Sequence, residues 1–398
     1  MSEIYLDNAA TTRTSKTAVE AMLPYFDICY GNPSSLHSVG QRAAEALNEA
    51  RRAVAECLGA ADAKEITFTS GGSEADNQAL RTIARLGKKQ KKMHIISTAF
   101  EHHAVLHALK ALEKEGFEIT LLDVHKNGLV TAEEVRAAIR PDTCGVSIMY
   151  ANNEIGTVQP IREIGAVCRE MKVLFHTDAV QAVGHLPIDV QKDNIDMLSL
   201  SAHKFGGPKG VGVLYAKKGV LLETLIHGGA QERGKRAGTE NIASIMGMVA
   251  AMKESIENMP AHAEKMLRMR DRLIDGIAAA IPHCELNGDR ESRLPGNVSF
   301  CFEGIEGEAL LLLLDMHGVC ASSGSACTSG SLDPSHVLLA IGRPHEVAHG
   351  SLRLSLSHET TDEEVDTVLR VLPEVVSTLR NMSPVWRDLQ NGKRQYII

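Results

Sequence analysis

The amino-acid sequence predicts an α/β fold in which helices cover a mostly parallel sheet. Short runs rich in β-branched residues alternate along the chain with longer amphipathic stretches. This alternation is typical of β-α-β units, whose connections place consecutive strands parallel to one another. The 398 residues are enough for two or three domains at roughly 150 residues each.

The expected strands of the first part are six short apolar runs. They span residues 65–69, 93–97, 117–123, 143–150, 173–177 and 195–200. Two stretches between them, 74–86 and 161–171, have the apolar spacing of amphipathic helices. A seventh run, 211–216, follows a Gly-Gly-Pro-Lys-Gly turn that leaves no room for a helical crossover. We therefore expect that strand to be antiparallel to its predecessor.

The second part of the chain predicts a smaller α+β unit. Residues 244–281 have a helical pattern with a break expected at Pro260, because proline lacks the N–H that a helix interior needs. Shorter strands and helices follow. We expect a large domain over 1–259, a small domain over 260–398 and residues 1–15 packed on the small domain. The tail over 384–398 is expected to be a terminal helix with a loose end.

Composition and charge exclude several classes of protein. Lysine and arginine total 42 against 50 aspartates and glutamates, so no broad basic surface for nucleic acid or anionic lipid is expected. Hydrophobic residues at 44% exclude disordered and fibrous classes. The apolar run 310–314 is too short to span a bilayer, and the first residues lack the regions of a signal peptide. We therefore expect a cytoplasmic protein without nucleic-acid or membrane partners.

The cysteines predict one exceptional thiol. Eight cysteines lie at positions 29, 57, 144, 168, 284, 301, 320 and 327, without any Cys-x-x-Cys pair. A local zinc or iron–sulfur cage is thus not expected, and most thiols should be small buried hydrophobes. Cys327 lies among small residues that cannot pack a core, which predicts a mobile loop over 321–332 with an accessible thiol. The alternative is a serine-rich linker with an incidental cysteine. No metal site is expected, apart from Cys327 as a ligand of a transient cluster.

Polar residues follow five of the expected strands, where ligands of open α/β sheets bind. They occupy positions 70–73, 101–103, 152–154, 178–181 and 201–204. In the first of these, two glycines and the Ser73 hydroxyl at the start of a helix suit a phosphate, although a plain helix N-cap is the alternative. The segment has neither the Walker lysine nor the glycine spacing of a dinucleotide site.

Two further strand ends indicate a particular cofactor. Asp178 ends a hydrophobic strand and needs a cationic partner such as a protonated pyridine nitrogen, unless it only caps a helix. Lys204 follows an apolar strand directly, and burial of an amine favours its neutral, nucleophilic form. With the phosphate-binding turn, and with His102 placed to stack on a ring, these residues indicate pyridoxal 5'-phosphate.

Several motifs between residues 4 and 358 resemble those of one family, the NifS/IscS-type cysteine desulfurases of the class V aminotransferases. The motifs are Tyr5-Leu-Asp-Asn-Ala-Ala-Thr-Thr, Gly31-Asn-Pro-Ser-Ser-Leu-His37, Asn152-Asn-Glu-Ile-Gly156, Ser201-Ala-His-Lys204, Arg236-Ala-Gly-Thr-Glu240 and Ser322-Ser-Gly-Ser-Ala-Cys-Thr-Ser329. The resemblance implies the type I fold of pyridoxal-phosphate enzymes, with a mostly parallel seven-stranded sheet in the large domain. It also implies a homodimer with sites at the subunit boundary.

The resemblance also implies a role for each cofactor-binding residue. Lys204 would hold pyridoxal 5'-phosphate, Asp178 would pair with its pyridinium nitrogen and Gln181 would bond its phenolic oxygen. His102 would stack on the ring and help to move protons, and Asn153 would lie near the phenolic oxygen and the substrate. The phosphate would be bound by Gly72, Ser73, Ser201 and His203, joined by Thr239 of the partner subunit.

By the same resemblance the substrate is L-cysteine. Arg353 would bind its carboxylate, a task that suits a bidentate guanidinium, although a surface charge on a strand is the alternative. Lys204 would remove the Cα proton, and the Cys327 thiolate would take the sulfur as a persulfide while alanine leaves. The sulfur would then pass to an iron–sulfur scaffold or another acceptor protein.

Other functions compete with this interpretation. A selenocysteine lyase or an aminotransferase would use the same fold, but neither obviously needs the long loop around Cys327. A non-catalytic sulfur-carrying subunit would leave the buried amine of Lys204 without a partner, which is costly. A metal hydrolase built on His102, His103, His203 and Asp178 is disfavoured because the histidines lack a compact ligand spacing.

Overall fold

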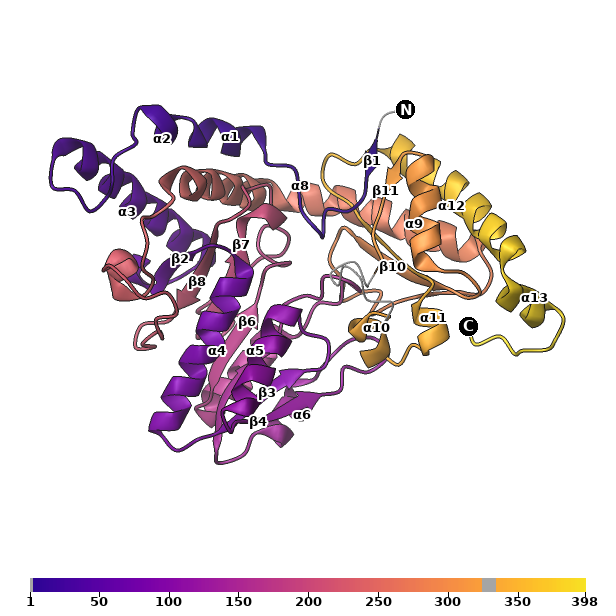
Figure 1. Ribbon diagram of the computed structural model, residues 1–398, viewed down its shortest axis with the longest axis horizontal. Coiled ribbons are helices and arrows are strands. Elements are labelled where there is room, and N and C mark those ends of the chain that lie inside the picture. The colour runs from indigo at the N-terminus through magenta and orange to yellow at the C-terminus, as the bar shows by residue number, and fades with distance from the viewer. Residues whose placement is uncertain (1–2, 324–333) are drawn as a thin grey trace.

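The computed structural model describes residues 3–323 and 334–398. Cys327 and most of the segment 321–332 lie outside the described residues. A seven-stranded sheet and a three-stranded sheet are joined by one long helix, α8 (Ile242–Ala280), which crosses the molecule in Figure 1. Among the described residues, no helix has both the length and the apolarity needed to cross a membrane.

The large sheet confirms the predicted α/β fold. Its strands lie in the order β2 (Ile66–Thr69), β8 (Gly212–Ala216), β7 (Met197–Ser201), β6 (Leu174–Asp178), β5 (Thr143–Ser147), β3 (His94–Thr98) and β4 (Glu118–Leu122). The pairs from β7 through β6, β5 and β3 to β4 are parallel, whereas β8 is antiparallel to both of its neighbours. The seventh run was therefore correctly predicted as antiparallel.

Both faces of this sheet are buried, as parallel sheets require. Successive residues of a strand point to opposite faces, so Ile95 joins one apolar cluster while Ile96 joins another. Helices α4 (Gly72–Lys89) and α5 (His103–Lys114) cover the first face, as Figure 1 shows. Helices α3 (Ser38–Leu58) and α7 (Ile161–Met171) contribute to the cluster on the other face.

Helix α8 is continuous over 39 residues, so the break expected at Pro260 was wrong. Its buried residues end at Met252 in one apolar cluster and resume at Met266 in another. Pro260 is exposed between these two parts. Proline removes one N–H, but on an exposed stretch water can solvate the carbonyl that loses its partner. Packing at both ends then keeps the helix whole. The domain boundary expected near residue 260 stays a prediction.

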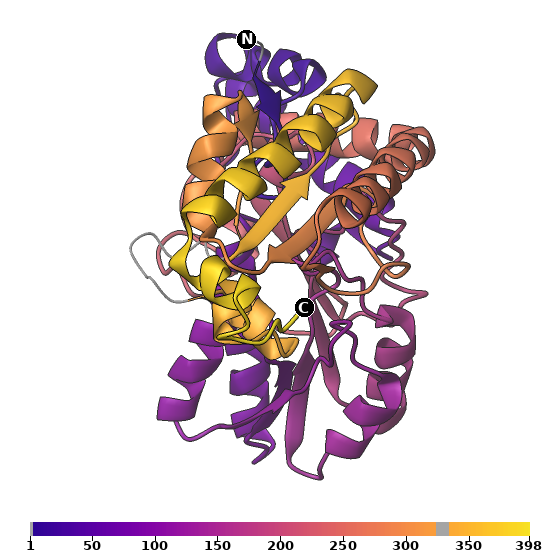
Figure 2. The ribbon, with the colours of Figure 1, turned by 90° about the vertical axis from the view of Figure 1, so that its right-hand side faces the viewer.

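The C-terminal part forms an antiparallel sheet in the order β12 (Ser351–Ser355), β10 (Asn297–Phe302) and β9 (Cys284–Leu286). Helices α9 (Gly307–Met316) and α12 (Asp362–Met382) pack together beside it, as Figures 1 and 2 show. The N-terminal strand β1 (Ile4–Tyr5) pairs with β11 (Val319–Cys320). Residues 4–7 therefore lie against the C-terminal part of the chain, and Asp7 bridges to Ser355 of β12.

The C-terminal tail is anchored. It begins with the expected helix, α13 (Pro384–Gln390), but the loose end expected after it was wrong. Tyr396 stacks on His283 with ring centroids 3.7 Å apart, and the Ile397 N–H donates to the Glu303 carboxylate at 2.9 Å. Because Glu303 is buried, its charge needs such donors, and the end of the chain supplies them.

Candidate active site

The turn between β2 and α4 is shaped to hold an anion. No side chain caps the N-terminus of α4, so its first backbone N–H groups are available to a ligand. Gly71 has φ of 152°, a conformation that residues with a Cβ rarely adopt. A Cβ on Gly72 would lie 2.6 Å from Cγ2 of Val180. The glycines therefore let the turn approach the ends of β6 and β7 closely.

The five predicted strand ends come together at one edge of the sheet. A Cβ on Gly71 would lie 3.4 Å from Oγ of Ser201, at the end of β7. The Asn152 side chain, after β5, donates to the Phe100 carbonyl, after β3, at 3.0 Å. The amide of Gln181, after β6, donates to the Ala9 carbonyl at 2.9 Å. The contact with Ala9 adds the N-terminal segment to this edge.

Lys204 lies directly after β7, in the short 3-10 helix η2 (Ala202–Lys204). Its Nζ donates to the carbonyls of Ala9 at 2.6 Å and Ala10 at 2.9 Å. Since Gln181 donates to the same Ala9 carbonyl, the N-terminal segment lies beside two of the expected cofactor-binding residues. The sequence analysis quoted this segment as a motif but gave its residues no role.

Asp178 ends β6 next to Lys204 and is buried. One of its oxygens accepts the Val180 N–H at 2.9 Å. Burial raises the pKa of Asp178 to about 6, and the positive charge of Lys204 opposes that rise. A cation facing Asp178, such as a protonated ring nitrogen, would favour its ionised form further.

Two more buried carboxyl groups, Asp76 on α4 and Glu101 after β3, lie near Asp178. Glu101 belongs to a predicted polar strand end but was given no role, and Asp76 was not predicted. Burial raises the pKa of Glu101 to about 8, and it holds the pKa of Asp76 well above its usual range. Glu101 is therefore predominantly protonated at neutral pH. The sequence does not indicate that Asp76 is buried, because an amphipathic helix also accommodates an aspartate on its exposed face.

Two histidines of the site are held neutral. His102 caps α5, where its Nδ1 accepts the Ala104 N–H at 3.1 Å. Burial, together with the charge of Lys204, lowers the pKa of His102 to about 4. The Nδ1 of His203 lies 3.1 Å from Oγ1 of Thr11, and the same causes lower its pKa to about 4. Both rings are therefore uncharged at neutral pH, and because Nδ1 of His102 accepts the Ala104 N–H, Nε2 of His102 carries the ring proton.

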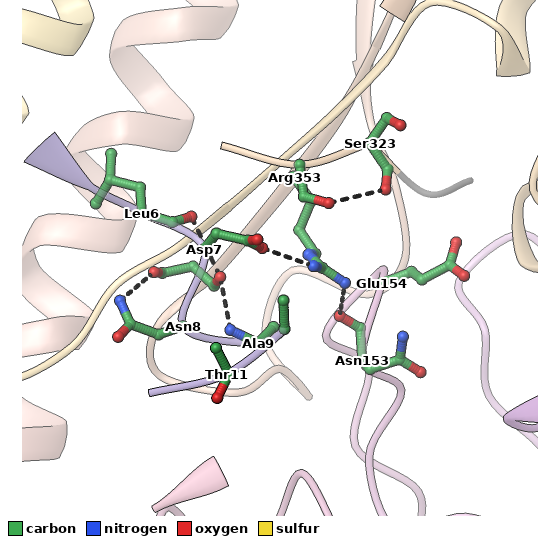
Figure 3. A network of polar contacts seen from close by, with 12 residues as sticks. Leu6, Asp7, Asn8, Ala9, Thr11, Asn153, Glu154, Ser323 and Arg353 are labelled. Atoms are coloured by element: carbon green, nitrogen blue, oxygen red, sulfur yellow. Dashed lines mark hydrogen bonds and ion pairs between the residues drawn. The ribbon is translucent and has the colours of Figure 1, made fainter. Parts of the chain in front are cut away.

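Arg353 projects from β12 toward the same edge and is only 4% exposed, so the alternative of a surface charge was wrong. Figure 3 shows its guanidinium between Asp7 and the loop that follows β5. Its Nη2 donates to Oδ1 of Asp7 at 2.9 Å, and its Nη1 donates to the Asn153 carbonyl at 3.1 Å. Among the described residues, Nε of Arg353 has no hydrogen-bond partner.

Ser73 and Thr239 are exposed in this chain. Thr239 lies in a segment that Arg236 ties to the first turn of α4, through a hydrogen bond to Glu74 at 2.9 Å. This segment is therefore held near the anion-binding turn. Cys327 lies outside the described residues.

A buried ion pair fixes the same segment and was also missed from the sequence. Arg51 donates to both carboxylate oxygens of Glu232, at 2.6 and 2.7 Å, and Glu232 also accepts the Phe68 N–H at 3.0 Å. Arg51 lies four residues after Leu47 and three before Val54, both buried on α3. An arginine at this apolar spacing is the signal that could have predicted a buried partner.

The prediction that most of the other cysteines are buried is confirmed for three of the seven described ones. Cys144, Cys168 and Cys301 are buried, and the remaining four are partly buried. Burial raises the pKa of Cys144 and Cys301 to about 11 and that of Cys168 to about 12. These three thiols stay protonated at neutral pH and are poor nucleophiles. The described residues include no group of three or more His, Cys, Asp or Glu side chains arranged to hold a metal ion.

Comparison with known proteins agrees with this geometry. The profile of the family "Aminotransferase class-V" matches residues 4–368. A cysteine desulfurase IscS from Clostridium botulinum is 56% identical over 99% of each chain. A solved NifS-like protein has a TM-score of 0.88 and 38% identity, covering 95% of this chain and all of the other. The solved structure of SspA in complex with cysteine has a TM-score of 0.79 and 37% identity, covering 90% of this chain and all of the other.

The cofactor of this family is pyridoxal 5'-phosphate, and the residues present fit it. Uncapped N–H groups and two glycines suit a phosphate, while a buried acid and a lysine amine follow the adjacent strands β6 and β7. The predicted fold class and the family resemblance are both confirmed. The chain belongs to the class V aminotransferases and, within them, to the NifS/IscS-type cysteine desulfurases.

Proposed function

We propose that this protein is a pyridoxal-phosphate-dependent cysteine desulfurase, which converts L-cysteine to L-alanine and keeps the sulfur as a persulfide on Cys327. One observation carries the proposal. The segment 7–10 contacts both the Lys204 amine and the buried Arg353 guanidinium, which are the groups that an amino-acid substrate needs beside the cofactor. The relatives named cysteine desulfurase, matched over almost the whole chain, support the same chemistry.

The protein would hold the cofactor through residues from several strand ends. The first turn of α4, with Ser73, Ser201 and His203, would bind the phosphate. Asp178 would face the ring nitrogen, and Gln181 would donate to the phenolic oxygen. Asn153 would lie near that oxygen and the substrate. When bound, pyridoxal phosphate withdraws electrons from the substrate's Cα and so makes its proton acidic.

The remaining steps belong to side chains of the protein. Arg353 would bind the substrate carboxylate and so orient the Cα–H bond. The Lys204 amine would remove the Cα proton, and neutral His102 would help to move protons near the ring by donating from Nε2.

Cys327 would act as the nucleophile. Its thiolate would attack the substrate's sulfur and form an S–S bond while the C–S bond breaks. The electron pair of the broken C–S bond would stay on the carbon until that carbon is protonated. The products are alanine and an enzyme persulfide.

We also propose a homodimer. Large apolar side chains are exposed along one stretch of the sequence, on and after α1 (Lys16–Met22) and α2 (Pro24–Asp27). They are Val19, Leu23, Phe26, Ile28, Tyr30 and Leu36, of which Leu36 is 91% exposed. Exposed apolar residues gathered in this way are typical of an interface. A second copy would cover them, and each subunit would place its Thr239 near the phosphate of the other.

The sulfur would leave the protein on an acceptor, which we propose to be an iron–sulfur scaffold or another sulfur-accepting protein. The seven described cysteines are free thiols, which supports a reducing compartment such as the cytoplasm.

The experiment that tests the function is an incubation of the purified, cofactor-loaded protein with L-cysteine. Mass spectrometry should detect alanine and map one added sulfur atom to Cys327. The Cys327→Ala variant should keep the yellow colour of the bound cofactor yet release no sulfide under reducing conditions. Turnover at the wild-type rate in this variant would overturn the proposed mechanism.

A further inference from the structure

The N-terminal segment lies against both cationic groups of the site. The Ala9 and Ala10 carbonyls accept hydrogen bonds from Nζ of Lys204, while the Asp7 carboxylate accepts one from Nη2 of Arg353 at 2.9 Å. Figure 3 shows Asp7 and Asn153 on two sides of the guanidinium. Asp7 therefore lies where the carboxylate of a bound amino acid would meet Arg353.

The donors of Arg353 are only partly used. A guanidinium binds a carboxylate best through two parallel N–H···O bonds. Asp7 takes one of the donors on the edge formed by Nε and Nη2, and Nε itself is buried without a partner among the described residues. On the other side, Nη1 is held by the Asn153 carbonyl. The Nε/Nη2 edge is thus half filled in this conformation.

Arg353 nevertheless needs an anion, because it is 4% exposed and a buried charge without a partner is costly. The carboxyl group of Glu154, whose ionisation the charge of Arg353 favours, is a weak substitute because it points away from the guanidinium (Figure 3). Burial raises the pKa of Glu154 to about 7, and its side chain accepts a hydrogen bond from the Ser335 hydroxyl. Without Asp7, the remaining groups near the guanidinium would be the Asn153 carbonyl and the partly ionised Glu154.

Asp7 can leave Arg353 without moving its backbone. The backbone of residue 7 bridges Ser355, and the Tyr5 hydroxyl donates to the carbonyls of Asp7 and Thr11 at 3.3 and 2.8 Å. The Asp7 side chain is 23% exposed, so rotation about its own bonds would bring the carboxylate to water.

We propose that Asp7 is a positioning residue that occupies the carboxylate-binding donors of Arg353 in the ligand-free protein, and that the substrate carboxylate displaces it. The inference rests on the proposed function for the identity of the substrate. A ligand without a carboxylate cannot replace Asp7 on Arg353. Asp7 therefore adds selectivity for amino acids, at the cost of weaker binding of every one of them.

The test uses propionate, a carboxylate without an amine or a thiol, and propionamide, its uncharged analogue. Asp7→Asn keeps the shape of the side chain and removes the charge. The cofactor-free variant should be less stable to heat than the wild type, and propionate should raise its melting temperature more than that of the wild type. Propionamide should leave both proteins unchanged. The control is Asp366→Asn, which removes an exposed ion pair with Arg272; it should respond to propionate as the wild type does.

A second measurement uses the cofactor-loaded protein. Asp7→Asn should lower KM for L-cysteine, about tenfold if displacement of Asp7 costs about 1.4 kcal/mol, with kcat little changed. A higher KM, or a melting temperature that propionate raises equally in variant and wild type, would overturn the proposal.

If the variant does not fold, a crystal of the wild type soaked in propionate tests whether the carboxylate displaces Asp7. Asp7 still bonded to Arg353 beside a bound propionate would also overturn it. Neither propionate experiment involves Cys327 or turnover, so a failure of the proposed function is recognised separately.

Discussion

Asp178 shares its surroundings with two other buried carboxyl groups, but it also accepts the Val180 N–H and feels the positive charge of Lys204. Burial raises the pKa of all three, but Lys204 opposes the rise at Asp178. Asp76 lies instead 3.7 Å from Nε2 of His176, whose pKa burial lowers to about 3. The fold thus makes Asp178 easier to ionise than Glu101.

This difference predicts opposite outcomes for one kind of substitution. Asp178→Asn removes the charge that would face the ring nitrogen, and kcat should fall by about 10² or more. Asp76→Asn keeps the shape of a side chain that lies on α4 beside His176 and does not end a strand at the site, and kcat should change less than about threefold. Steady-state kinetics with L-cysteine measures both. Equal losses in the two variants would contradict the assignment of the charge to Asp178.

Glu101 predicts a dependence of stability on pH. Its pKa is raised from 4.5 to about 8 in the folded protein. Its contribution to stability is therefore complete below about pH 4.5 and is lost as the pH rises to about 8, because the unfolded chain releases this proton first. Glu101→Gln removes the titration while keeping an acceptor for the Thr98 hydroxyl and the Met149 N–H.

The measurement is urea unfolding of the cofactor-free protein at pH 5 and pH 9. Relative to the wild type, Glu101→Gln should gain stability between the two pH values, by about 1.4 kcal/mol for each unit of pKa shift that the fold imposes. A difference between the two proteins that does not vary with pH would show that Glu101 is ionised in the fold.

The start of α4 depends on its first residue having no side chain. Gly72→Ala would place a methyl group 2.6 Å from Cγ2 of Val180 and push the helix away from β6. The phosphate would lose good contacts with the N–H groups, so the affinity for pyridoxal phosphate should fall about tenfold or more. Absorbance titration of the cofactor-free protein measures this affinity. Adding Val180→Ala should make room for the methyl group and recover most of the loss; without such recovery, the steric explanation fails.

The sequence predicted the elements of the large sheet because local pattern and burial agree there. The residues of β5, β6 and β7 are almost all buried, and their short runs contain the apolar and β-branched residues that a covered parallel strand favours. The pattern failed at Pro260 and at the C-terminal end, where distant contacts decide. Local propensity does not show that α8 packs at both ends, or that the Ile397 N–H donates to Glu303.

The sequence predicted those site residues whose charged side chains lie at the end of an apolar strand. Lys204 and Asp178 stand out because charged residues directly follow apolar strands. Asp7 and Glu232 did not stand out, since their partners, Arg353 and Arg51, lie 346 and 181 residues away in the sequence. Such pairs depend on the folded topology; the position of Arg51 on the apolar face of α3 indicates a buried partner but does not identify it.

The exposed apolar stretch from Val19 to Leu36 predicts the state of association of the whole molecule. Phe26→Glu, at a side chain 63% exposed, should convert a dimer into monomers and weaken cofactor binding, because Thr239 of the partner subunit would be lost. Analytical ultracentrifugation with absorbance detection measures both. Met316→Glu on α9, where the side chain is 75% exposed, is the control and should remain dimeric. A monomeric wild type would contradict the proposed homodimer.

The unbroken α8 has a mechanical consequence. A helix of 39 residues is about 58 Å long, at 1.5 Å per residue, and it is clamped by a different apolar cluster near each end. A rod held in this way acts as a lever, so a tilt of a few degrees at one clamp becomes a shift of several ångströms at the other. Pro260, with no N–H to lose, is the point where such a rod bends at least cost.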